Sequence, residues 1–386
     1  MKEKAFNGDR LKTARIYRGL TAAELADKMG IKRQTISMYE NKKLTNPEID
    51  KIHEMSKILN FPMNFFLEES NDNVVVSPST YFRSLLTTNK KYRQEQETKI
   101  DIICRIYAFI SEYIEFPTLN LPSYDKYSTP VEAAIALRAQ WGLADNPIDN
   151  LVYLCEQNGI IVTSFNTSTR AIDAFSQNLS IQGEERYVIA YSKNKTTAAR
   201  IHFDVAHELG HILLHDWSDN LEMLSPEEFR NREMEANEFA AAFLLPQSAF
   251  IKDVGSFAGN IKYYEVLKNK WHVSISAMIM RSKNLDLIDY EKYQSMMRYM
   301  QKLGIRKKEP LDDVLITAQP SILKTAVEML LNGKVLTARE FMMELSNDYG
   351  ISLYPDEVEE LLDLKKGTLS ISDNIIPIHE LNLKED

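Results

Sequence analysis

Apolar side chains recur with a helical period along most of this chain. Between residues 90 and 116 they return every three or four positions, which predicts one long helix with an apolar face. A second strong helix is expected at 232–245, where an alanine-rich run stops at Pro246. Beyond residue 290 the same period predicts three further helices, at 321–332, 338–348 and 356–364.

Only short stretches have the composition of strands. Residues 74–76 are three valines, and residues 186–192 read Arg-Tyr-Val-Ile-Ala-Tyr-Ser, which is rich in β-branched and aromatic side chains. We therefore expect a mainly α fold with a small β-sheet, of the α+β class.

The first 68 residues have the spacing of a helix-turn-helix. One helix ends at Gly19, Thr21 and Glu24 form a capping box for the next helix, and Gly30 makes the turn that follows. The helix at 32–41 exposes polar side chains that can reach phosphates or base edges. The candidate DNA contacts are Lys32, Arg33, Gln34, Thr35 and Ser37.

Residues 6–68 resemble the Cro/repressor-type (XRE) DNA-binding domain. The resemblance is carried by the run 34–41 and by the tail Phe61-Pro62-x-x-Phe65-Phe66. It implies a DNA operator as partner and a homodimer that binds paired half-sites. It also implies a structural salt bridge between Arg10 and Glu40.

A metal-binding pattern lies in the middle of the chain. Residues 207–211 read His-Glu-Leu-Gly-His, and on a helix residues four apart share a face. His207 and His211 can then bind one Zn²⁺, while Glu208 can act as general base on water at the metal. His215 lies eight residues after His207, about 12 Å further along the helix axis, so we give it no ligand role.

The third zinc ligand is expected from the helix at 232–245. Glu235 is the first candidate, with 23 residues between it and His211 for the chain to turn back. Glu233 and Glu238 are possible replacements. Glu238 could alternatively orient a zinc-bound histidine through a hydrogen bond to its ring.

Several separated motifs between residues 130 and 285 resemble, in the right order, the ImmA/IrrE family of zinc metallopeptidases. The resemblance implies a gluzincin-like site in which His207, His211 and Glu235 bind zinc and Glu208 is the base. It also implies proteolysis of a narrow set of protein partners, usually repressors. The motifs are 137–143, Pro147-Ile148, 156–162, 171–175, the zinc helix and 235–240.

Gluzincin-like sites hold the substrate backbone along an edge strand, so residues 186–192 are the candidate cradle. Four side chains nearby could stabilise the oxyanion, and the sequence does not choose among them. They are Tyr187, Tyr191, Arg200 and His202.

Composition and charge support two different functional parts. Residues 1–60 carry 13 Lys and Arg against 8 Asp and Glu, a net charge of +5, whereas the whole chain has −9. A basic head on an acidic body suits DNA binding at one end. No signal region or long apolar stretch is present and the two cysteines are too few for a disulfide framework, so we expect a cytoplasmic protein without a membrane partner.

The expected organisation is a helix-turn-helix domain at 1–68, a linker with a long helix at 69–129, a zinc peptidase at 130–289 and a helical C-terminal region at 290–386. We expect a DNA-binding transcriptional regulator that cleaves a repressor or antitoxin-like partner through Glu208 and Zn²⁺. The alternative is a non-proteolytic repressor, or an antitoxin encoded beside a toxin, in which the zinc domain is structural or a sensor.

Overall fold

The computed structural model describes residues 5–68, 75–82, 90–123, 129–166, 174–193, 197–217, 224–317 and 319–370. Several parts of the predicted regions lie outside these residues. They include residues 69–74, 83–89 and 124–128 of the linker, residues 167–173, 194–196 and 218–223 of the peptidase region, and the chain end at 371–386.

The N-terminal head is an all-helical unit. Its helices are α1 (Gly8–Tyr17), α2 (Ala22–Lys28), α3 (Arg33–Glu40), α4 (Ile49–Leu59) and the 3-10 helix η1 (Met63–Leu67). The capping box at the start of α2 is present, because Thr21 and Glu24 each bond the other's backbone N–H. Glu40 does not follow the expectation of a partner at Arg10: it accepts two hydrogen bonds from Arg15, at 2.5 and 2.9 Å. The guanidinium of Arg10 instead lies over the Phe65 ring.

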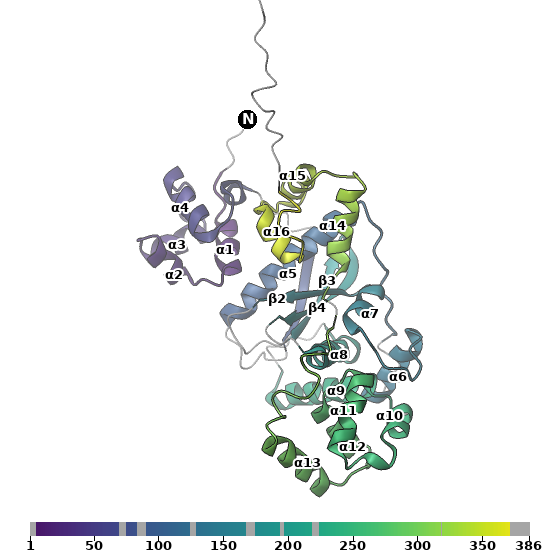
Figure 1. Ribbon diagram of the computed structural model, residues 1–386. Coiled ribbons are helices and arrows are strands. Elements are labelled where there is room, and N and C mark those ends of the chain that lie inside the picture. The colour runs from purple at the N-terminus through teal and green to yellow at the C-terminus, as the bar shows by residue number, and fades with distance from the viewer. Residues whose placement is uncertain are drawn as a thin grey trace, which may run out of the picture.

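A four-stranded sheet forms the centre of the molecule (Figure 1). Its strands are β1 (Val75–Phe82), β2 (Ile161–Phe165), β3 (Ala174–Ile181) and β4 (Glu184–Ser192), in the order β1-β3-β4-β2. The β1-β3 and β3-β4 pairs are antiparallel, and β2 runs parallel to β4. The mainly α fold with a small sheet is confirmed. The prediction of an edge strand at 186–192 is wrong, because β4 lies between β3 and β2.

Each face of this sheet belongs to a different hydrophobic core. Along β4, Val188 and Ala190 belong to one core, whereas Tyr187, Ile189 and Tyr191 belong to the other. This alternation follows from the two-residue period of a strand. The sheet is therefore a shared wall between two helical layers.

The first core is covered by helices from three separate stretches of the chain. It contains the head, the long helix α5 (Lys90–Ile110), and the C-terminal helices α14 (Ile322–Asn332), α15 (Ala338–Tyr349) and α16 (Pro355–Leu361). The apolar face predicted for residues 90–116 packs here. The presumed linker thus supplies both a strand and a core helix, and the end of the chain packs on the same side.

The second core is covered by the helices of the expected peptidase region. They are α6 (Pro130–Gln140), α7 (Leu151–Gln157), α8 (Ala198–Leu214), α9 (Pro226–Leu244), α10 (Gln247–Val254), α11 (Ile261–Trp271), α12 (Ile275–Asn284) and α13 (Tyr290–Lys302), with the short 3-10 helix η4 (Gly255–Phe257).

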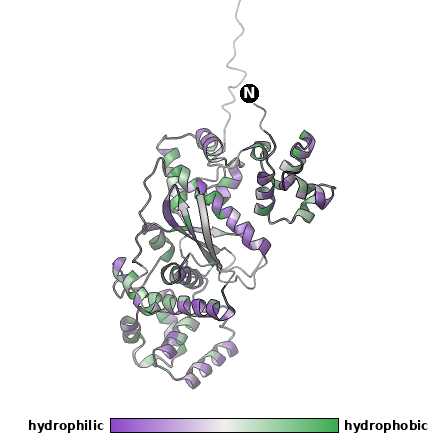
Figure 2. Cartoon of the chain, turned by 180° about the vertical axis from the view of Figure 1, so that it is seen from behind, coloured by the Kyte–Doolittle hydropathy of each residue, from purple (hydrophilic) through white to green (hydrophobic). Residues whose placement is uncertain are grey.

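Figure 2 shows the first halves of α5 and α9 as hydrophilic, in contrast to the apolar residues packed around the sheet.

The head is held against the body by polar contacts. The hydroxyl of Tyr17 donates to the carboxylate of Glu357 on α16 at 2.6 Å, and Arg18 forms an ion pair with the same carboxylate at 2.7 Å. On α5, Lys91 pairs with Glu24 at 2.8 Å. The C-terminal region, to which the sequence assigned no role, therefore contacts the head directly.

Both cysteines are free and buried, as expected for small core residues. Cys104 lies on α5 and Cys155 on α7. In the described part of the chain no helix combines the length and the hydrophobicity that a membrane crossing requires.

Helices α8 and α9 approach each other unusually closely at Gly210. A Cβ atom added there would lie 3.0 Å from the Cα of Ala236 and 3.2 Å from its carbonyl oxygen. These are backbone atoms that cannot turn away, so a larger residue at this position would require the two helices to shift by a few tenths of an ångström. The contact sits between His207 and His211 and therefore sets the geometry of the metal-binding pattern.

We predict that Gly210→Ala forces α8 and α9 apart. Overpacking of this kind lowers the free energy of unfolding by about 1–3 kcal/mol, which chemical denaturation would measure. Ile135→Ala, at a side chain that is 62% exposed on α6, is the control and should change stability by less than about 0.5 kcal/mol. An equal, small effect of both substitutions would contradict the tight contact.

Candidate metal centre

Helix α8 places two imidazoles side by side. His207 and His211 are one helical turn apart, both are fully buried, and their Nε2 atoms lie 3.0 Å from each other. The helix forms because the run Ala198–Leu214 has an apolar face that packs on the sheet and on α9. Two buried ring nitrogens that face each other make a natural position for a cation.

Helix α9 supplies one carboxylate to this position, from Glu233. Its oxygens lie 3.5 Å from Nε2 of His207 and 3.3 Å from Nε2 of His211. Among the described residues, only these three form a group of His, Cys, Asp or Glu that could hold a metal ion, with ligand atoms within 4.8 Å of one another.

Glu235 does not join this group, so the first candidate for the third ligand is corrected to Glu233. Residues 233 and 235 point to different sides of a helix, since two positions correspond to more than half a turn. The side chain of Glu235 is 49% exposed and its carboxylate lies 3.1 Å from Nε2 of His215. Ala236, which touches Gly210, faces α8 together with Glu233.

A network of hydrogen bonds fixes the ring orientation of both histidines. Nδ1 of His207 lies 3.1 Å from Oδ1 of Asn237, an atom that can only accept. Nδ1 of His211 lies 2.9 Å from Nδ1 of His215, whose Nε2 faces the carboxylate of Glu235. These contacts are all satisfied when the rings of His207 and His211 carry their protons on Nδ1. The Nε2 lone pairs of both rings then face Glu233.

Glu238, expected to orient a zinc-bound histidine, does not lie at the site. It is exposed, and its charge acts on the guanidinium of Arg281. Asn237, its neighbour, contacts His207 instead and also donates to the backbone oxygen of Glu233 at 2.7 Å. One amide thus connects two of the three groups of the centre.

Glu208 is fully buried beside the histidines. One of its carboxylate oxygens accepts a hydrogen bond from the hydroxyl of Ser176 at 2.6 Å. Ser176 lies on β3, so the sheet and α8 together fix the orientation of this carboxylate.

Burial and charge set the protonation states that a metal site needs. Desolvation lowers the pKa of His211 well below its usual value, so the ring is neutral and has a free lone pair at neutral pH. Burial opposes the ionisation of Glu233, but its close contacts with the rings of His207 and His211 outweigh burial and lower its pKa to about 2. The centre therefore offers the neutral imidazole of His211 and the anionic carboxylate of Glu233.

The four oxyanion candidates have contacts of other kinds. The hydroxyl of Tyr187 donates to Glu185, and that of Tyr191 lies 3.4 Å from Gln319. Arg200 forms an ion pair with Asp204. Nε2 of His202 lies 3.0 Å from the hydroxyl of Thr317, and burial lowers the pKa of this histidine to about 3.

The candidate DNA contacts lie at the start of α3. Lys32 is the N-cap residue of the helix and is exposed, as are Arg33 and Gln34. Thr35 and Ser37 are half-buried, and Ser37 accepts a hydrogen bond from Asn41. Three of the five residues are therefore openly accessible to a ligand on this surface.

Sequence reasoning did not identify Asn237 and Ser176, and it ranked Glu233 below Glu235. A signal for two of them was present in the spacing. Glu233, Ala236, Asn237 and Ala240 follow the i, i+3, i+4, i+7 pattern of one helix face, with small residues where α8 approaches. Ser176 had no such signal, because its role depends on the packing of a strand against α8.

Comparison with family models agrees with this geometry. Residues 155–283 match the family described as IrrE N-terminal-like domain, of peptidase type M78, and residues 11–66 match the Helix-turn-helix family. No match is found among curated proteins. The chain is thus a fusion of a repressor-type helix-turn-helix domain with an IrrE-like domain of a metallopeptidase family, as its motifs indicated.

Proposed function

We propose that this protein is a DNA-binding regulator whose IrrE-like domain is a zinc-dependent endopeptidase acting on a repressor or antitoxin-like protein. The observation that carries the proposal is the convergence of the two Nε2 atoms and the Glu233 carboxylate beside Glu208. A DNA-binding head on the same chain suits a protein whose substrate is itself a regulator.

The three groups fit zinc by distance and by chemistry. A tetrahedral zinc with bonds of about 2.0–2.2 Å keeps its ligand atoms roughly 3.3–3.6 Å apart. Glu233 lies 3.3 and 3.5 Å from the two imidazoles, within this range. The two Nε2 atoms are 3.0 Å apart and would separate by about 0.3 Å around the ion. Two imidazoles and one carboxylate, with a further position left for substrate or water, are typical of a catalytic rather than a structural zinc site.

The chemistry divides between the ion and the protein. When bound, zinc supplies positive charge that acidifies water and polarises the scissile carbonyl. Glu208 would accept the proton of the attacking water and deliver it to the leaving amine. The hydrogen bond from Ser176 holds the plane of that carboxylate, so its orientation does not depend on the substrate.

The surroundings of the centre support a working site. Asn237 and the pair His215–Glu235 bond the Nδ1 sides of the two histidines, which directs both Nε2 atoms inward. Partners of this kind commonly change metal affinity or activity by about 10–100-fold when they are removed. A purely structural site has no need of Glu208.

The first experiment measures zinc content and cleavage in the same preparations. We expect about one zinc per chain in the wild type, loss of zinc in Glu233→Gln, and retention in Glu235→Gln, because only Glu233 lies against the two imidazoles. Glu208→Gln should keep zinc and lose about 10²–10⁴-fold in cleavage rate, the usual contribution of a general base. Metal analysis and gel assays against repressor-like proteins encoded nearby provide both readouts.

Glu227→Gln, an exposed change in the first turn of α9, is the matched control and should leave both quantities unchanged. Zinc retention in Glu233→Gln together with loss in Glu235→Gln would return the ligand role to Glu235. Cleavage that survives Glu208→Gln would refute the catalytic assignment.

Ser176→Ala tests whether the sheet positions the base. A hydrogen bond to a charged group contributes about 1.5–3 kcal/mol, so kcat should fall by roughly 10–100-fold with zinc content and KM unchanged. Ser180→Ala, on the same strand opposite Glu185, should have no effect. A change in KM with an unchanged kcat would assign Ser176 to substrate binding instead.

DNA binding by the head is expected to depend on the start of α3. Arg33→Ala and Gln34→Ala should weaken binding to DNA upstream of the gene by about 1–3 kcal/mol each, and Arg33→Ala should also reduce the salt dependence. Fluorescence anisotropy at several salt concentrations measures both effects. Lys302→Ala, an exposed cation on α13, is the control, and an equal effect of Lys302 and Arg33 would point to nonspecific attraction.

A further inference from the structure

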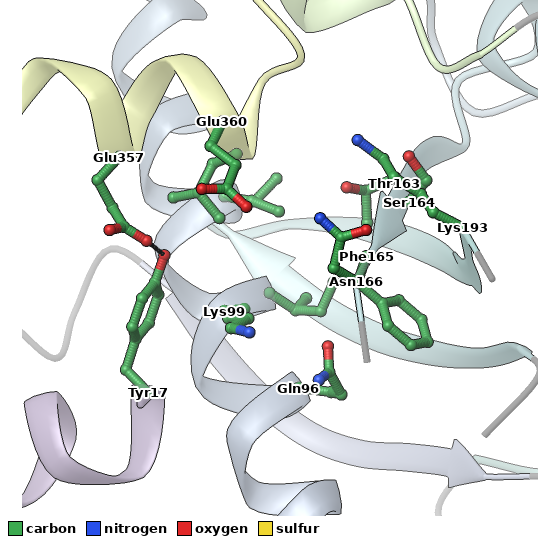
Figure 3. A pocket seen from close by; sticks show the side chains of 13 residues that line it. Tyr17, Gln96, Lys99, Thr163, Ser164, Phe165, Asn166, Lys193, Glu357 and Glu360 are labelled. Carbon is green, nitrogen blue, oxygen red and sulfur yellow. Dashed lines mark hydrogen bonds between the residues drawn. The ribbon is translucent and has the colours of Figure 1, made fainter. Parts of the chain in front are cut away.

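A small cavity lies where the head meets the body. Figure 3 shows that its wall is assembled from α1, α5, α16 and the end of β2. The carboxyl ends of the parallel strands β2 and β4 both reach it, through Asn166 and Lys193. Ligands of proteins with parallel strands commonly bind at such ends.

One wall residue has an unused hydrogen-bond donor. Gln96 is only 2% exposed, and its Nε2 has no hydrogen-bond partner among the residues that the structure describes. A buried amide donor without an acceptor destabilises a fold, so such groups usually serve a ligand or water. The side chain of Gln96 lines the cavity.

The other polar groups of the cavity carry both signs of charge. Figure 3 shows Glu360, Asn166, Lys99 and Gln96 directed toward the same central space. The ammonium group of Lys99 lies 2.7 Å from Glu95 and still has donors to spare, since an ammonium has three. The carboxylate of Glu360 lies on one side of this space, and the side chains of Lys99 and Gln96 lie on the other. This arrangement matches a ligand that has a positive charge at one end and a negative charge at the other.

We infer that this cavity binds a small zwitterion of the free amino acid class, whose carboxylate contacts Lys99 and Gln96 and whose ammonium group contacts Glu360. The cavity is partly open, and its volume of about 60 Å³ suits the polar end of such a molecule, with the side chain directed to the opening. A space of that size would otherwise hold about four water molecules.

A ligand in the cavity would contact the region where the head is attached to the body. Tyr17 of α1 is part of the wall, and its hydroxyl donates to Glu357, which also holds Arg18. Both residues of the head are therefore fixed by the same α16 that carries Glu360. A ligand that bridges α5 and α16 stabilises this docked arrangement, so the site is an effector site for the DNA-binding head.

The test uses the full-length protein and the twenty proteinogenic amino acids, each supplied singly at millimolar concentration. At least one should raise the midpoint of thermal unfolding by about 2 °C or more, as mass action requires of a ligand well above its Kd. Calorimetric titration of that amino acid then gives its affinity. If none of the twenty shifts the midpoint, the inference is overturned.

Two variants tie the binding to this cavity. Glu360→Gln and Gln96→Met should each weaken the affinity at least tenfold, whereas Asp356→Asn, an exposed carboxylate on the same helix, should leave it unchanged. Gln96→Met should also raise the unfolding midpoint of the ligand-free protein, because it removes the unpaired donor. Wild-type affinity in both variants would place the ligand elsewhere and refute the site.

This inference is independent of the peptidase proposal. Neither readout involves zinc or cleavage, so an inactive metal centre leaves the binding result unaffected. Equally, the absence of amino acid binding would say nothing against Glu208 or Glu233.

Discussion

The close contact between α8 and α9 determines what the centre of this protein can do. Gly210 and Ala236 bring the two backbones so close that a Cβ atom at position 210 would lie 3.0 Å from the Cα of Ala236. At that distance Glu233 reaches the two imidazoles, and Asn237 reaches His207 from the same helix face. Each member of the candidate metal centre thus depends on one interhelical separation.

The central sheet positions the larger parts of the molecule relative to one another. Because side chains alternate along β4, the sheet supports the peptidase helices on one face and the head, α5 and the C-terminal helices on the other. Ser176 on β3 extends from this wall to Glu208. The same sheet therefore connects the metal centre physically with the layer that carries the DNA-binding head.

The C-terminal region has a structural role, because it holds the head against the body. Glu357 on α16 holds Tyr17 and Arg18, although more than 300 residues separate them along the chain. The charge balance of the sequence suggested a basic module attached to an acidic body. The structure adds that the attachment is specific and includes a polar cavity at the junction.

Three of the predictions that failed share one reason, which is that they concerned pairings between distant segments. Glu233 rather than Glu235 faces the two imidazoles, because small residues set the face of α9 that meets α8. Glu40 paired with Arg15, one turn and a half beyond Arg10 on α1. The strand at 186–192 formed as expected, but its place inside the sheet depended on β2 joining its far side.

The sequence by itself determined the local features of this protein. Helical periods, the capping box at Thr21 and the spacing of His207 and His211 depend on residues a few positions apart, and the structure contains all of them. Only the tertiary structure decided which carboxylate faces the histidines, which hydroxyl bonds Glu208, and where the head docks. The spacing of small residues on α9 carried a partial signal for Glu233. The other outcomes arise from the packing of helices and strands that are far apart in sequence, which periodicity does not specify.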